Sequence, residues 1–147
     1  WSPMETKPLQ STDEPINLTY QDLWDRLPVD SLSLPEEMDQ NHEYFKMVLE
    51  ESTRLWENME LARLLANTVE NQKRMDYLGQ KRVKDGKFNT NDEAKWLAAV
   101  DTEVVDAQTN AIKAESLFRK WDGLKRQYEQ RQMIINSKLK MQLQGYS

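Results

Sequence analysis

Apolar residues recur at alternating steps of three and four along two long stretches of this chain, and this spacing is the feature that most constrains its fold. The first stretch carries the seam Phe45, Val48, Ser52, Leu55, Met59, Ala62, Ala66 and Val69. The second carries Leu97, Val100, Val104, Ala107, Ala111, Ala114, Phe118 and Trp121, continued by Tyr128, Ile135 and Leu139. Such spacing places one apolar stripe on each of two helices. Strand-like alternation is not sustained anywhere, so an all-α fold is predicted.

The prolines mark where the helical body begins. All five lie within residues 1–35, and the 112 residues that follow contain none. We predict a helix over about residues 35–78, a loop at 79–91 that contains Asp85-Gly86, and a helix over about 92–143. Thr90 and Glu93 have the spacing of a capping box for the second helix. Two helices of similar length joined by a short loop predict a long antiparallel, coiled-coil-like hairpin over residues 35–147.

The segment before the hairpin has a different composition. Residues 1–43 carry ten acidic and two basic residues, whereas residues 44–147 have a net charge of +3. We therefore predict an extended acidic arm over residues 1–34. Thr19 and Asp22 form a second capping pair, and Pro28 stops the chain from continuing as a helix. One short anchoring helix is expected within the arm, at residues 19–27.

This short helix has one apolar face, which is expected to pack in a groove. Its face consists of Tyr20, Leu23, Trp24 and Leu27, at positions i, i+3, i+4 and i+7. A helix of about two turns is unstable alone in water, so it needs a groove to fold into. The spacing is similar to that of the segment by which a tumour-suppressor transcription factor docks on its ubiquitin ligase, which is a likeness of recognition mode. Three arrangements remain open: packing on its own hairpin, docking on another subunit, or a regulatory role.

The helical body also carries candidate partner-binding residues. Leu61 and Leu65, together with Leu64, widen the stripe of the first helix beyond one seam. On the second helix, small residues that permit close approach are followed by bulky anchors: Ala107, Ala111, Ala114, Phe118 and Trp121. A two-helix hairpin covers only one stripe of each helix. We therefore expect other protein subunits, a second copy of the chain, or the arm to cover the rest.

Residues that could support chemistry are scarce. The chain has a single histidine, His42, and no cysteine, which excludes cysteine-based metal sites and thiol nucleophiles. The glycines form no phosphate-binding loop. A calcium loop built around Gly86 would need Lys81 and Val83 as ligands, which cannot coordinate the ion. We expect no catalytic residues, no metal ligands and no cofactor, and therefore no enzyme.

The longest apolar run spans residues 96–100, far short of the ~20 residues that cross a bilayer. No transmembrane segment is predicted. The absence of cysteine favours an intracellular location: the cytoplasm, the nucleus, or an organelle matrix after removal of a presequence.

Basic residues cluster at two places. One cluster surrounds the loop and contains Lys73, Arg74, Lys81, Arg82, Lys84 and Lys87, and the other contains Arg119, Lys120, Lys125, Arg126 and Arg131. Interleaved acidic residues and a pI near 5.0 weaken both clusters, so nucleic acid is not expected as the main partner.

These observations favour a non-enzymatic structural or accessory subunit of a larger protein assembly, with the hairpin as a strut and the arm as a tether. The alternative is a regulatory binding module whose short helix docks in a partner's groove and whose coiled coil dimerises. A membrane-remodelling helical dimer is a third possibility, and the small positive charge of the body, +3, disfavours it.

Overall fold

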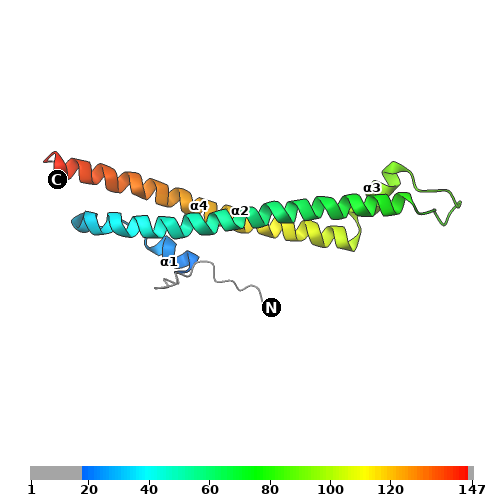
Figure 1. Ribbon diagram of the computed structural model, residues 1–147, viewed down its shortest axis with the longest axis horizontal. Coiled ribbons are helices and arrows are strands. Elements are labelled where there is room, and N and C mark those ends of the chain that lie inside the picture. Colours follow the sequence, from blue (N-terminus) through cyan, green and yellow to red (C-terminus); the bar gives the residue numbers. More distant parts are fainter. Residues whose placement is uncertain (1–17, 146–147) are drawn as a thin grey trace. The chain divides into compact units, whose positions relative to one another are not determined.

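The computed structural model describes residues 18–145, and this part of the chain is helical without a β-strand (Figure 1). The elements are α1 (Tyr20–Asp25), a 3-10 turn (Ser31–Ser33), α2 (Leu34–Leu78), α3 (Asn91–Ala99) and α4 (Thr102–Leu143). The long helices α2 and α4 pack together, which confirms the predicted all-α helical hairpin. The first half of the predicted acidic arm, residues 1–17, lies outside the described residues.

The chain divides into two compact units. The first contains residues 18–54 and 118–145 of the described chain, and the second contains residues 55–117. In the first unit, the rings of Tyr44 and Tyr128 meet edge to face with centroids 6.4 Å apart. In the second, Arg63 pairs with Glu115 at 3.2 Å. Each unit therefore contains a stretch of α2 packed against a stretch of α4.

Residues of the predicted seams form part of the core of each unit, and residues outside the seams complete it: Leu124 in the first unit, and Ala94 and Ala98 in the second. In the first unit the buried apolar residues include Val48, Leu124 and Ile135, together with Tyr128. In the second unit they are Leu55, Met59, Ala66, Ala94, Ala98, Val104 and Ala107. Ser52, the polar member of the first seam, is also buried. The heptad spacing thus identified much of the buried stripe on α2 and α4. At α3 it did not, because Leu97 is partly exposed and Val100 is exposed, whereas Ala94 and Ala98 are buried.

The second long helix differs from the prediction of one helix over 92–143. It is interrupted at Val100 and Asp101, between α3 and α4. Asp101 takes the position before the first residue of α4, and its Oδ1 accepts a hydrogen bond from the backbone N–H of Glu103 at 2.9 Å. Aspartate is favoured at this capping position because it satisfies a free amide. Val100, expected on the seam, is consequently exposed.

The short helix α1 ends at Asp25, two residues before the predicted end at 27. Its start agrees with the predicted capping box, because Thr19 Oγ1 accepts from Asp22 N and Asp22 Oδ2 accepts from Thr19 N, both at 3.0 Å. The hydrogen bond from the Thr19 backbone lowers the pKa of Asp22.

Pro35 lies in the first turn of α2, where the backbone N–H that proline lacks would have no partner within the helix.

Candidate functional site

The helix α1 lies against the hairpin of its own chain. Leu23 is completely buried, and its carbonyl oxygen accepts a hydrogen bond from the Tyr128 hydroxyl at 2.6 Å. The Tyr20 ring packs edge to face on Trp121, with centroids 5.4 Å apart. Trp24 makes a similar contact with Tyr20 at 6.1 Å. Packing on its own hairpin is the first of the three arrangements considered from the sequence. Leu23 can contact a partner only if α1 detaches from the hairpin.

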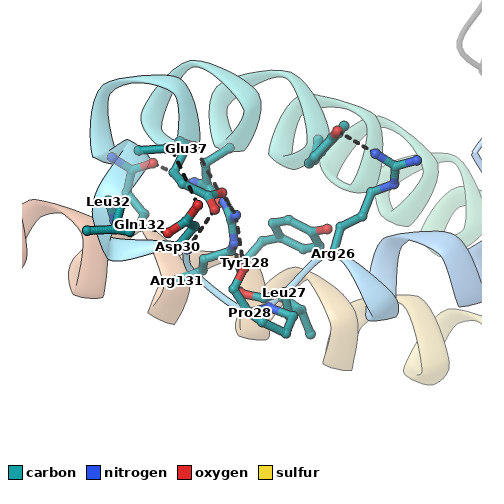
Figure 2. A network of polar contacts seen from close by, with 12 residues as sticks. Arg26, Leu27, Pro28, Asp30, Leu32, Glu37, Tyr128, Arg131 and Gln132 are labelled. Carbon is teal, nitrogen blue, oxygen red and sulfur yellow. Dashed lines mark hydrogen bonds and ion pairs between the residues drawn. The ribbon is translucent and has the colours of Figure 1, made fainter.

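A buried arginine holds the segment that follows α1 (Figure 2). The Arg131 side chain is only 3% exposed. Its Nε donates to the carbonyl oxygen of Leu27 at 2.9 Å, its Nη1 donates to Asn41 Oδ1 at 2.9 Å, and its Nη2 pairs with the Glu37 carboxylate. We call these four residues the arm clamp. Because the guanidinium joins α2, α4 and the arm segment, the clamp fixes where α1 sits.

Sequence reasoning assigned Arg131 to an exposed basic cluster, and this was wrong. The signal for its burial was its position, seven residues after Leu124 and between Tyr128 and Ile135, all of which are buried. A charged residue in a core register needs internal partners. Burial also raises the pKa of the Tyr128 hydroxyl to about 12, so this group stays protonated and can donate to the arm.

The second unit exposes apolar side chains on α2. Leu61 is 65% exposed and Leu65 is 58% exposed, and Leu64 between them is exposed as well. We call these three residues the leucine flank. The described chain leaves the flank uncovered, and the partner-binding role assigned to it stays a prediction.

The predicted small-residue stripe divides between the two units. Ala107 is buried in the second unit, where Ala111 and Ala114 are partly exposed. Ala111 and Ile112 line a shallow hollow beside the Arg63–Glu115 ion pair. Phe118 and Trp121 belong to the first unit, where Trp121 is buried beneath Tyr20.

Residues 80–89 form a tight turn that we call the tip loop. The backbone N–H of Arg82 donates to the Lys87 carbonyl at 2.7 Å, and that of Asn89 donates to the Gln80 carbonyl at 3.1 Å. Gly86 has a φ of 71°, a left-handed conformation that favours glycine. The Asp85 carboxylate accepts from the backbone N–H of Lys87 at 3.0 Å. The dipeptide Asp85-Gly86, read as a turn, closes the loop.

The tip loop carries exposed basic and aromatic side chains. Lys81 lies over the Phe88 ring, with its Nζ 5.3 Å from the centroid, and Phe88 is 57% exposed. Lys84 and Lys87 are exposed and make no ion pair with any residue of the described chain. Val83, at the turn, is fully exposed. The loop therefore presents two unneutralised cations beside an accessible ring.

Two other members of the predicted basic cluster, Lys73 and Arg82, are neutralised by ion pairs. Lys73 Nζ lies 3.1 Å from the Glu103 carboxylate and 4.0 Å from that of Asp101. Asp101 also accepts a hydrogen bond from the Tyr77 hydroxyl at 2.6 Å, which is the main reason why its pKa is lowered. Arg82 pairs with Asp85 and with Glu93. Only part of the cluster identified from the sequence is thus available to a ligand.

No cluster of three or more histidine, cysteine or acidic residues within residues 18–145 is arranged to hold a metal ion. Within the same range, no helix is long and apolar enough to cross a membrane.

Comparison with known proteins gives one finding about the fold. No protein-family profile matches the chain, and no curated protein sequence matches it. Among solved structures, the recombination mediator protein UvsY of bacteriophage T4 is similar, with a TM-score of 0.64 and 18% sequence identity. The alignment covers 84% of this chain and 91% of that chain. The two proteins therefore share a fold over most of both chains.

This finding corrects one expectation from the sequence. Nucleic acid was not expected as a partner because the pI is near 5.0. A protein of the same fold is named a recombination mediator, so the low pI of this chain is not a ground for setting nucleic acid aside as a partner. The expectation failed because net charge averages over the chain, whereas binding depends on the charge of one surface.

Proposed function

We propose that this chain is a non-enzymatic accessory protein that binds nucleic acid strands through its tip loop. The observation that carries the proposal is the local arrangement of Lys84, Lys87 and Phe88, which places exposed cations without acidic partners beside an exposed ring. The shared fold with a protein named for mediating recombination supports the same reading.

The chemistry of the loop fits a strand with accessible bases. Lysine side chains attract phosphates, and binding releases the counterions that the phosphates had held. An exposed aromatic ring can stack on a base, which contributes ~1–3 kcal/mol per base in proteins that bind single strands. With two or three lysines per loop, we expect the logarithm of the binding constant to fall with the logarithm of salt concentration with a slope of about −1.4 to −2.1.

The test is fluorescence anisotropy with a labelled oligothymidine and with a duplex of equal length. The variant Lys84→Glu/Lys87→Glu should lose about tenfold or more in affinity and should reduce the salt slope by about two phosphate contacts. The control, Lys46→Glu/Lys140→Glu, makes the same charge change at exposed lysines of the first unit. Equal loss in both double variants, or no binding by the wild type, would refute the proposal.

We further propose that the leucine flank joins this chain to a second copy of itself, as expected of a strut in a larger assembly. Complete burial of an exposed leucine contributes ~1.5–3 kcal/mol. Leu61 and Leu65 are each more than half exposed, so covering the flank yields more than half of that contribution from each of them. Assembly would also raise the affinity of several weak tip loops for one strand.

Sedimentation of the wild type over a range of concentrations measures this association. Leu61→Glu/Leu65→Glu should shift the mass toward that of one chain. The matched control replaces Leu32 and Leu143, which are also exposed leucines but lie in the first unit, with glutamate. A monomeric wild type would refute self-association and would point to a different subunit as the cover of the flank.

A further inference from the structure

Arg82 is the basic residue of the tip loop whose charge is paired with carboxylates in the described chain. Its Nη2 lies 2.8 Å from Asp85 Oδ2, within the loop. Its Nη1 lies 2.9 Å from Glu93 Oε2 and 3.1 Å from Glu93 Oε1, in the first turn of α3. The guanidinium is thus held by two carboxylates, one from the tip loop and one from the first turn of α3.

Both carboxylates have a second role that fixes them in place. Asp85 accepts the Lys87 backbone N–H, and Glu93 accepts the Thr90 backbone N–H at 2.8 Å as part of the capping box of α3. The hydrogen bond from the Thr90 backbone, followed by that from Arg82, lowers the pKa of Glu93. Because backbone bonds hold the two carboxylates, they remain in position when Arg82 moves.

The ion pairs themselves are accessible to solvent. The side chains of Arg82, Asp85 and Glu93 are all partly exposed. Such pairs contribute little stability and exchange readily. Arg82 also borders a hollow beside the exposed Trp96. A guanidinium binds a phosphate with the same two-pronged geometry that it uses for a carboxylate.

We infer that Arg82 is a phosphate-binding residue of the tip loop, and that Asp85 and Glu93 lower the affinity of the loop by competing with nucleic acid for it. This inference rests on the proposed function of the tip loop. Binding a strand then exchanges carboxylates for phosphate at Arg82. Lys84 and Lys87 make the first contact, since neither has an acidic partner in the part of the chain that is described.

The key variant is Asp85→Asn. Asparagine removes the charge but retains an oxygen that accepts the Lys87 N–H, so the turn is preserved. We expect the affinity for oligothymidine to rise about fivefold, because Arg82 becomes easier to release. The control is Asp76→Asn, in the last turn of α2, which makes the same charge change at an exposed carboxylate that forms no ion pair within residues 18–145. It should change the affinity by less than about twofold.

A double-mutant cycle distinguishes competition for Arg82 from general repulsion. In the Arg82→Gln background, Asp85→Asn should change the affinity by less than about twofold, because the competed group is absent. Arg82→Gln alone should lower the salt slope by about one phosphate contact. An equal gain from Asp85→Asn with and without Arg82, or an equal gain from Asp76→Asn, overturns the inference and leaves the proposed function intact. Absence of binding by the wild type and by Asp85→Asn overturns both.

Discussion

Replacing Arg131 with methionine tests whether the arm clamp determines the stability of the first unit. Methionine has a long unbranched side chain and no donor, so it fills much of the space of the arginine stem without replacing its hydrogen bonds. The substitution removes the Arg131 donor from Glu37 Oε1, from the Asn41 amide oxygen and from the Leu27 carbonyl oxygen.

The magnitude follows from burial. The Arg131 side chain is 3% exposed and that of Glu37 is 12% exposed, so water reaches neither group freely. Removal of one partner from a buried ion pair costs about 3–5 kcal/mol, because the remaining charge stays buried without its counter-charge. Glu37 Oε2 still accepts a hydrogen bond from the backbone N–H of Asp30 at 2.7 Å, but no cation replaces Arg131 at Oε1. We therefore expect Arg131→Met to lower the free energy of unfolding by about 3–5 kcal/mol.

Urea unfolding followed by far-ultraviolet circular dichroism, at one fixed protein concentration, measures this change. The matched control is Arg126→Met, since Arg126 lies on the same helix and pairs with Asp122 at 3.0 Å, but its side chain is 72% exposed. The free energy of unfolding of the control variant should fall by less than about 1 kcal/mol. Similar losses in the two variants would show that the burial argument is wrong.

Three further predictions test local features of the two units. The Tyr77 hydroxyl lowers the pKa of Asp101 below its ordinary value of 3.8. The Asp101 carboxylate therefore contributes stability above pH 3.8, and this contribution is lost as the pH falls through the folded-state pKa. Asp101→Asn should flatten the pH dependence of thermal unfolding, and an unchanged profile would contradict this. Gly86→Ala, at a φ of 71°, should cost about 1–2 kcal/mol. At Gly123, within α4 of the first unit, an added Cβ meets no atom within 4 Å apart from the neighbouring backbone of its own helix, so Gly123→Ala should stabilise the protein by about 0.5–1 kcal/mol. Melting temperatures that shift in the same direction for both variants would reject the backbone argument. Thr90→Ala removes the cap of α3 and should cost about 1 kcal/mol, and retention of the wild-type melting temperature would show that the cap is dispensable.

Local and periodic features of this protein could be predicted from its sequence. The two seams, the capping boxes at Thr19 and Thr90, and the turn at Gly86 all depend on residues close together in the chain. A heptad spacing identifies the stripe that a helix buries, whichever partner covers it. The apolar face of α1 could be identified in the same way. The surface that this face covers, on the hairpin of its own chain, could not.

Tertiary structure decided which charges are available and which are used internally. Arg131 and Lys84 are both basic residues among polar neighbours in the sequence, yet one is buried against a carboxylate and carbonyls while the other is exposed. Asp101 interrupts the second helix, and its carboxylate is held by Tyr77, which lies 24 residues away. A residue's type determines the charge that it carries, but the energy of that charge depends on the groups that face it, and these come from distant parts of the chain.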